Sequence, residues 1–586
     1  MPKSHFFIHT EIQSAVYSNK SCHSTEIHQI KLYTATNHGH YTEIQTASYI
    51  VYSHWKTNKE PDYKPNNPPP LLSCGGRRLS PCCRRNTLHM LLSCGRRCLW
   101  KWKWKKASIE NINNMGVVLV GRLYVGITKR NGMFEFKKLI KSKAHKNFPP
   151  GPKKLPIIGH LHLISSLPYR SYRDLAKTYG PIMQLQLDRP QAIALKIMWY
   201  DYIDIAFAPY GNYWRQMRKI CIIELLSPKN VRSFGSIRND EVSSLIKYIR
   251  SSLGQPINLN EKITSLTSSI TCRAAFGKVC KDSGTFIKLM NKAIELAGGL
   301  VIADFFPSSK IVNTLSWSKI RLLMMRRKMD VILDNIFNEH KDSISKRNGE
   351  FGNEDLVDVL LRVKESGELD LPINDANIKA IIYDIFSGGT ETSSSTINWT
   401  MAELIKNPRV MAKAQAEVRE IFKGSKIIDE NKIRNLKYLK LVIKEALRLH
   451  PPLPLVPRCS REEIEISGYT IPVKIQVFIN NWAMQRDPKY WSNPENFEPE
   501  RFEKSSIDFV GGDFQFLPFG SGRRVCPGMT FGLANVELPL AQLLYNFDWK
   551  LPNGIEPEDL NMIENPGITS SRKENLYVIA TPYELA

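Results

Sequence analysis

The stretch FGSGRRVCPG, from Phe519 to Gly528, decides how the rest of the chain is interpreted. Three glycines, two arginines and one cysteine within ten residues are more than a simple turn requires. Glycine lets backbone groups approach a neighbouring atom closely, and arginine can bind an acidic group through two parallel hydrogen bonds. The stretch therefore predicts a loop in which the thiol of Cys526 has a chemical role.

The composition indicates a globular protein that is large enough to bury a cofactor. The chain has 586 residues, of which 42% are hydrophobic and 10% aromatic, and chains of this size bury a substantial interior. The net charge of +25 is concentrated near the N-terminus, because residues 1–147 hold 24 Lys and Arg against 7 Asp and Glu. No signal peptide opens the sequence, so we expect the 11 cysteines to be reduced thiols.

Residues 1–147 are expected to form a basic N-terminal extension with no convincing membrane helix. Residues 1–114 show no sustained helical or strand period, which is typical of disordered or non-native sequence. The alternative is a nucleic-acid or membrane-surface patch at Arg77–Lys106, which has ten basic residues, no acid and three tryptophans. The apolar stretch Met115–Ile127 contains Arg122 and would span only about 20 Å as a helix, against a hydrocarbon core of about 30 Å.

Prolines mark the start of the folded domain. The segment FPPGPKKLPIIGH, from Phe148 to His160, is rich in proline, which fixes extended backbone and excludes helix. Beyond this segment helical patterns dominate, and strand-like pieces such as IEISGYTIP near Tyr469 are short. We therefore predict one large, mainly helical α+β domain over residues 148–586, with small peripheral sheets.

A charged pair lies within an apolar helical pattern. In KEALRLHPP, Glu445 and Arg448 are one helical turn apart, and the residues around them are mostly apolar. A buried ion pair must be fully satisfied by its neighbours, and we expect Arg501 of the PERF motif to be the third partner.

Two glycines interrupt another helical pattern. In DIFSGGTETSSST, Gly388 and Gly389 each cost about 1 kcal/mol relative to alanine if the segment is helical. Either one helix ends at Gly388 and a second begins at Thr390, or a single helix opens there to admit a small ligand. In the second case Glu391 and Thr392 could deliver protons to that ligand.

The order and spacing of these motifs resemble the cytochrome P-450 family of haem-thiolate monooxygenases, in particular the plant microsomal enzymes of specialised metabolism. The resemblance covers about residues 148–586, and the cysteine stretch matches F-x-x-G-x-R-x-C-x-G at every fixed position. It implies the helix-rich cytochrome P-450 fold, with a haem b (iron protoporphyrin IX) buried between long helices. It also implies a monooxygenase that inserts one oxygen atom from O2 into a lipophilic small molecule.

The resemblance further implies partners and a location. Electrons would come from NADPH through NADPH-cytochrome P-450 reductase, at the cytosolic face of the endoplasmic reticulum membrane. Contact with the membrane surface is expected, although the sequence contains no convincing transmembrane anchor. A nucleic-acid partner is not expected, since only the charge of the extension supports one.

The resemblance also implies a role for each site residue. Cys526 would be the thiolate ligand of the iron, in the loop that begins at Phe519. Glu391 and Thr392 would supply protons during oxygen activation. The haem propionates would be bound by one indole and three guanidinium groups, those of Trp214, Arg218, Arg458 and Arg524.

One departure from the family pattern bears on activity. The segment that ends at Leu187 runs through Asp188 directly into RPQAIALKIM, where comparable proteins have a further strand and a short helix. A sheet strand and part of the substrate entrance are therefore expected to be missing near Asp188. The alternatives are a haem-binding but inactive protein, a faulty gene model, or a haem-thiolate isomerase or dehydratase that needs no external electrons. Retention of Glu391 and Thr392 favours oxygen activation over the last of these.

Overall fold

The computed structural model describes residues 148–583, apart from gaps at 156–158, 187–192, 279–282, 299–316, 347–353, 368 and 425–427, together with four short strands nearer the N-terminus. The longer helices of this part are α3 (Pro168–Tyr179), α5 (Asn212–Ile220), α7 (Gly235–Ser251), α8 (Leu259–Phe276), α9 (Ser283–Gly298), α12 (Trp317–Lys346), α13 (Leu356–Glu365), α14 (Asp375–Lys406), α15 (Pro408–Ile421), α17 (Lys437–Leu449) and α19 (Met529–Asn546). Shorter helices are α4 (Ile193–Met198), α6 (Pro228–Ser233), α16 (Glu430–Ile433) and α18 (Asn481–Met484).

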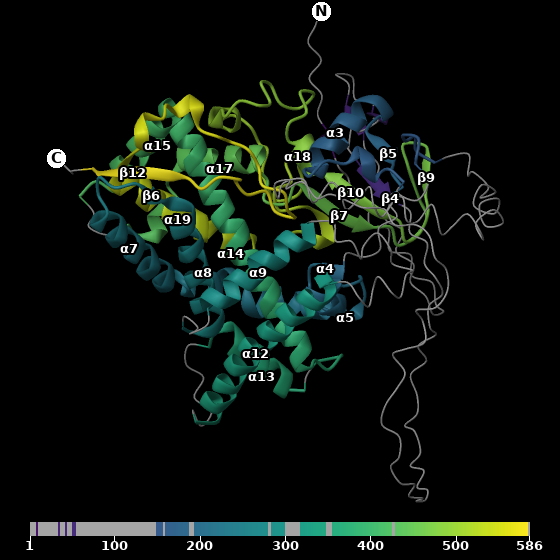
Figure 1. Ribbon diagram of the computed structural model, residues 1–586, viewed down its shortest axis with the longest axis horizontal. Helices are drawn as coiled ribbons and strands as arrows, with labels where there is room; N and C mark the ends of the chain where they lie inside the picture. The colour runs from purple at the N-terminus through teal and green to yellow at the C-terminus, as the bar shows by residue number, and fades with distance from the viewer. Residues whose placement is uncertain are drawn as a thin grey trace, which may run out of the picture. The chain divides into compact units, whose positions relative to one another are not determined.

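Helix α14 is the central element of the helical core. It begins with a reciprocal cap, in which the side chains of Asn374 and Asn377 each accept a hydrogen bond from the other residue's backbone N–H. Most of its residues are buried, and it packs against α8, α17 and α19 (Figure 1). A helix that is buried on most of its surface can place side chains in the interior of the protein.

The sheets are small and lie at the edge of the helical core. One has the order β5-β4-β10-β7, formed by Ile182–Gln184, Ile50–Ser53, Gln476–Asn480 and Leu455–Cys459. A second has the order β11-β12-β6, formed by Phe547–Lys550, Tyr577–Pro582 and Ile257–Asn258. Strands β8 (Ile464–Ile466) and β9 (Tyr469–Ile471) form a hairpin, and β1 (Ile8–His9), β2 (Tyr33–Ala35) and β3 (Tyr41–Glu43) form a separate sheet. The predicted α+β class, mainly helical with small sheets, is confirmed.

The structure differs from the sequence prediction in the N-terminal extension. Residues 1–114 have no sustained strand period, yet β1 to β4 form within them. Strand β4 pairs in parallel with β5 and antiparallel with β10. Asp188 itself and the apolar stretch Met115–Ile127 lie outside the described residues. Among the helices that are described, none combines the length and the apolar character that a membrane crossing requires.

Candidate active site

The cysteine loop is closed by its own backbone and followed directly by helix α19. Gly520 and Gly522 have φ values of 71° and 67°, a left-handed conformation that disfavours any residue with a side chain. The backbone N–H of Cys526 donates to the carbonyl of Phe519 at 2.9 Å. The ring of Phe519 packs edge-on against Phe509, with ring centroids 5.5 Å apart. These contacts fix the backbone conformation of the loop that presents Cys526.

The surroundings of the Cys526 thiol suit a metal ligand better than a free thiolate. Burial raises the pKa of Cys526, and this effect outweighs the opposing hydrogen bond from the backbone N–H of Gly528 and the positive charge of Arg218. A bound metal cation would deprotonate such a thiol, since metal coordination inverts the local pKa preference. Without such a cation, the burial of this thiol favours its protonated form.

Three guanidinium groups gather beside this loop. Arg218, Arg458 and Arg524 are half-buried, and none of them forms an ion pair with a carboxylate in the described part of the chain. Burial lowers the pKa of Arg458, and the nearby Arg524 lowers it further. Burial likewise lowers the pKa of Arg524; the nearby Asp204 opposes this effect, and Arg218 adds to it. Clustered cations that form no ion pair with a carboxylate of the described residues fit a group that carries two carboxylates, such as haem.

Arg218 joins the cation cluster to the cysteine loop. Its Nη2 donates to the carbonyl of Val525 at 2.6 Å. Trp214 lies in the same cluster, with the guanidinium carbons of Arg524 and Arg218 at 4.5 and 5.4 Å from its ring centroid. The indole N–H of Trp214, however, donates to the carbonyl of Ile205 at 2.9 Å. In this structure Trp214 therefore contributes ring contacts to the site, while its single donor is used within the protein.

Helix α14 runs without a break through the two glycines, so of the two alternatives left open by the sequence, the helix end at Gly388 with a new start at Thr390 is excluded. A Cβ on Gly389 would lie 3.2 Å from Phe531 of α19 and 3.2 Å from the hydroxyl of Thr271 of α8. Gly389 thus lies where three helices approach closely, and a side chain there would press on Phe531 and Thr271. A Cβ on Gly388 would meet nothing within 4 Å, which leaves free space beside the helix.

The two predicted proton-delivery residues make separate hydrogen bonds. The hydroxyl of Thr392 donates to the carbonyl of Gly388, one turn earlier. The carboxylate of Glu391 accepts a hydrogen bond from the hydroxyl of Thr569 at 3.3 Å. Burial raises the pKa of Glu391, and the Thr569 hydrogen bond only partly opposes this. Glu391 also lines a polar cleft of about 520 Å³, together with Ser394 and Asn398.

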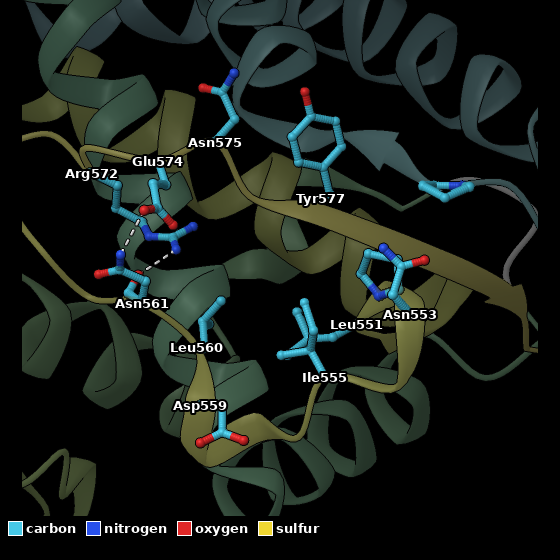
Figure 2. A pocket seen from close by; sticks show the side chains of 12 residues that line it. Leu551, Asn553, Ile555, Asp559, Leu560, Asn561, Arg572, Glu574, Asn575 and Tyr577 are labelled. Carbon is cyan, nitrogen blue, oxygen red and sulfur yellow. Dashed lines mark hydrogen bonds between the residues drawn. The ribbon is translucent and has the colours of Figure 1, made fainter.

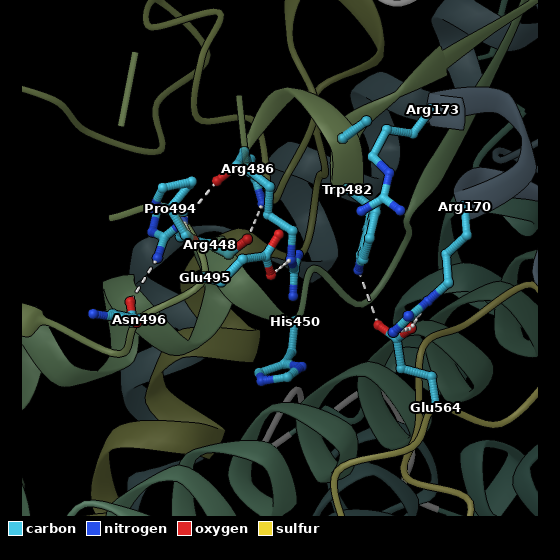
Figure 3. A network of polar contacts seen from close by, with 12 residues as sticks. Arg170, Arg173, Arg448, His450, Trp482, Arg486, Pro494, Glu495, Asn496 and Glu564 are labelled. Atoms are coloured by element: carbon cyan, nitrogen blue, oxygen red, sulfur yellow. Dashed lines mark hydrogen bonds and ion pairs between the residues drawn. The ribbon is translucent and has the colours of Figure 1, made fainter. Parts of the chain in front are cut away.

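The buried charged network is confirmed. Arg448 donates through Nε and Nη2 to both carboxylate oxygens of Glu445 at 2.8 and 2.9 Å, and Nε of Arg501 donates to the same carboxylate at 2.9 Å. Glu445 and Arg448 are fully buried. Figure 3 shows Arg448 reaching the carbonyls of Pro494 and Asn496 as well. This network fixes α17 to the following loops, and it does not include Cys526 or the cation cluster.

Another cavity of about 330 Å³ lies between residues 551–561 and strand β12 (Figure 2). It is lined by polar groups such as Asn561, whose side chain donates to Glu574 at 2.7 Å. None of the predicted site residues lines it. This cavity is therefore separate from the cysteine loop and from helix α14.

Sequence reasoning missed the segment Asp204–Ala208, whose backbone holds Trp214 and Arg524. The one signal for it is Asp384, a single charge within the apolar stretch IIYDIF. Asp384 accepts hydrogen bonds from this segment.

Comparison with known proteins agrees with this arrangement. A family described as Cytochrome P450 matches residues 195–578. Premnaspirodiene oxygenase of Hyoscyamus muticus is 54% identical over 469 residues, which cover 75% of this chain and 93% of that protein. 5-epiaristolochene 1,3-dihydroxylase of Nicotiana tabacum is 53% identical over 471 residues, covering 75% and 94%. Cytochrome P450 71D95 of Mentha spicata is 50% identical over 471 residues, covering 76% and 94%.

Proposed function

The chain belongs to the cytochrome P450 family, and on this premise we propose that it is a haem b monooxygenase that oxygenates a terpenoid-type small molecule. The observation that carries the proposal is the closed loop of Cys526 beside three guanidinium groups that have no carboxylate partner. Such a site offers one thiolate for iron and three cations for two propionates. Monooxygenation of a lipophilic small molecule is the activity of the family, whereas the haem type and the substrate class are our proposals.

Different residues would bind the iron and the propionates of the cofactor. Cys526 would ligate the iron, and Arg218, Arg458 and Arg524 would bind the propionates. When bound, a haem with a thiolate ligand supplies the electron density that favours cleavage of the O–O bond. The free space beside Gly388 leaves room for a small ligand next to helix α14.

Glu391 and Thr392 would deliver the protons that this reaction consumes. Because burial raises the pKa of Glu391, its carboxyl group is better able to hold a proton than an exposed glutamate is. Glu391 also faces a polar cleft, from which water could restore the proton. The hydroxyl of Thr392, at the helix turn beside Gly388, can both accept and donate a proton.

Replacing Thr392 with alanine should uncouple electron use from product formation. We expect Thr392→Ala to bind haem normally, because the residue lies outside the cysteine loop and the cation cluster. Product formed per NADPH consumed should fall at least about tenfold, since general acid catalysis by one group is worth that much or more. Thr400→Ala is the matched control, because the hydroxyl of Thr400 also donates to the carbonyl four residues earlier. Equal coupling in the two variants would rule out the role of Thr392.

The electron donor is proposed to be NADPH-cytochrome P-450 reductase, docked on an exposed basic surface. Around the ring of Tyr210 lie the guanidinium carbons of Arg461, Arg523 and Arg215, at 4.3, 5.3 and 5.9 Å from the ring centroid. Lys219 is exposed on the same helix as Arg215. A surface of this kind favours an acidic partner.

The names of the relatives support the proposed substrate class. The similar oxygenases from Hyoscyamus muticus and Nicotiana tabacum are named for premnaspirodiene and 5-epiaristolochene. Incubating the enzyme with reductase, NADPH and a panel of terpene hydrocarbons would test the proposal. We expect an O2-dependent product that is heavier by one oxygen atom, and a protein that loads haem but oxygenates none of the panel would contradict the substrate class.

We further propose that the enzyme acts at the endoplasmic reticulum membrane, with the apolar face of α12 on the lipid surface. This face consists of Ile320, Leu323, Met324 and Val331, which are 40 to 54% exposed and lie on one side of the helix. Exposed basic side chains flank it, namely those of Arg321, Arg327 and Lys328. Apolar groups beside basic ones favour an anionic lipid surface, and the same charges disfavour pairing with a second copy or with the basic extension.

Charged substitutions on the apolar face of α12 should weaken membrane binding. We expect Leu323→Asp together with Met324→Asp to reduce co-sedimentation with phosphatidylserine vesicles at least about fivefold, since burying one such side chain stabilises binding by about 1.5–3 kcal/mol. The control is Val510→Asp, at an apolar residue that is 65% exposed elsewhere. If the control reduced sedimentation as much as the double variant, α12 would not be the docking face.

A further inference from the structure

A short backbone segment connects helix α14 to the cation cluster. We call this segment, Asp204–Ala208, the strap. The backbone N–H groups of Ile205 and Ala206 donate to one oxygen of the Asp384 carboxylate at 2.7 and 3.2 Å. The next two, those of Phe207 and Ala208, donate to the side chain of Asp204 at 2.8 and 3.1 Å. Two acidic side chains thus satisfy four successive backbone donors.

The carbonyls of the strap hold the side chains of the cation cluster. Arg524 donates through Nη1 to the carbonyl of Ala206 at 3.2 Å and through Nη2 to the carbonyl of Ala208. The carbonyl of Ile205 accepts the indole N–H of Trp214. A guanidinium group has five N–H donors in a fixed plane, so these two bonds set its orientation and leave other donors for an anionic partner.

The two acidic groups are close enough to influence one another. Asp204 is 1% exposed, and its Oδ2 has no hydrogen-bond partner within the described structure. Burial and the nearby Asp384 raise the pKa of Asp204. Burial also raises the pKa of Asp384, although the two strap N–H groups oppose this effect. We therefore expect Asp204 to carry the proton and Asp384 to be the charged acceptor.

We propose that Asp384 is a positioning residue, which holds the strap against α14 and so orients Arg524 toward a carboxylate of the cofactor. The inference rests on the proposed function only for the identity of that carboxylate. The sequence of contacts runs from Asp384 through the Ile205 and Ala206 N–H groups to the Ala206 carbonyl and Arg524. Asp384 lies one turn before Gly388, so the same helix would orient a cofactor-binding arginine and border the free space beside it.

Amide hydrogen exchange in the haem-free protein tests the first part of this inference. In Asp384→Ala we expect the strap amides of Ile205 and Ala206 to exchange about tenfold faster, because they lose their shared acceptor. Amides of α17 should be unaffected. Asp375→Asn is the matched control, since Asp375 begins the same helix but pairs with Lys364 at 2.6 Å near the surface. Strap exchange equal to that of the control would overturn the inference.

Haem retention tests the second part. Transfer of haem from the loaded enzyme to excess apomyoglobin should be about tenfold faster for Asp384→Ala than for the control, because Arg524 loses its orientation. Asp384→Asn keeps one oxygen acceptor and should restore most of the retention. Faster strap exchange without faster haem loss would overturn the link to Arg524.

The pH dependence separates positioning by the acidic pair from a general packing effect. Protection of the strap amides, corrected for intrinsic exchange, should fall in the wild-type protein as pH rises from the ordinary carboxyl range toward the pKa of Asp204, which is raised to about 9. The folded state holds a proton that the unfolded carboxyls have already lost, so raising the pH favours opening. The groups facing the pair are Arg524, Tyr213, Tyr383 and Cys221. Of these only Arg524 is charged at neutral pH.

Asp384→Asn should weaken this pH dependence, because Asp204 loses the neighbouring negative charge that raises its pKa, while its burial remains. An unchanged pH profile in Asp384→Asn would overturn the inference even if the alanine variant failed to fold. Failure of the proposed function would look different. A wild-type protein without a thiolate-ligated haem would still show the strap exchange and its pH profile in the haem-free state.

Discussion

Cys526→Ala should abolish thiolate ligation and most haem retention. The loop presents one sulfur, whose position is fixed by the bond from its N–H to Phe519 and by the turns at Gly520 and Gly522. Alanine keeps the loop conformation, because the loss is confined to the side chain. The reduced, carbon monoxide-bound absorption spectrum is the measurement, and we expect the thiolate-type band to disappear completely. Arg218, Arg458 and Arg524 would remain, so weak binding of haem without that band is compatible with this expectation.

Cys459→Ala is the matched control. Cys459 lies on β7 and is a free cysteine; the residue as a whole is exposed, while its thiol is partly covered. Its pKa is raised by burial of the thiol, with only a partly opposing effect of Lys474, so it shares with Cys526 a tendency to stay protonated. The control should keep the full thiolate-type band. A band that survived in Cys526→Ala and vanished in Cys459→Ala would transfer the ligand assignment to β7.

The cysteine loop could be predicted from sequence because its conformation is local. The positive φ angles of Gly520 and Gly522 and the bond between Cys526 and Phe519 all arise within eight residues. The buried pair of Glu445 and Arg448 could be predicted for a similar reason, since both lie on one face of an apolar helix. In each case the residue types and their spacing contain most of the information that the structure uses.

The continuity of α14 could not be predicted in this way. Local rules allow a helix end at Gly388, and the decision comes from Phe531 and Thr271, which approach Gly389 from two other helices. Strand β4 is a second case, because it pairs with β10 more than 400 residues away and has no strand period around it. Tertiary contacts decided both features.

The hydrogen-bond acceptor of Trp214 could not be predicted from the sequence either. The family resemblance implied that Trp214 contacts a propionate. In the structure the indole N–H of Trp214 donates instead to the carbonyl of Ile205 on the strap. Asp384 could have been noticed as a lone charge in an apolar helix, which is a common sign of a buried partner. The partners of Asp384 are backbone N–H groups, however, and residue types do not show which backbone groups will lie near a given side chain.

Glu445→Ala should prevent the domain from folding stably. The glutamate is the shared acceptor of two guanidinium groups, Arg448 at 2.8 and 2.9 Å and Arg501 at 2.9 Å, and its carboxylate also accepts the backbone N–H of Glu498. Removing it leaves Arg448, which is fully buried, with an uncompensated positive charge. Breaking a buried pair from one side costs about 3–5 kcal/mol of unfolding free energy, a large part of the stability of a typical domain. Chemical denaturation followed by circular dichroism measures the loss.

The helical pair of Asp174 and Lys177 provides the control, because it has the same three-residue spacing as Glu445 and Arg448 but is exposed. Its atoms are 3.0 Å apart and its side chains 54 and 69% exposed, so water can replace either partner. Asp174→Ala should therefore cost less than about 1 kcal/mol. Similar losses in the two variants would mean that Arg448 keeps enough carbonyl partners, at Gln485, Pro494 and Asn496, to remain buried without its carboxylate. A larger loss in Glu445→Ala, reduced when Arg448 is also replaced by methionine, would identify the stranded charge as the cause, because methionine removes the charge and keeps much of the apolar volume.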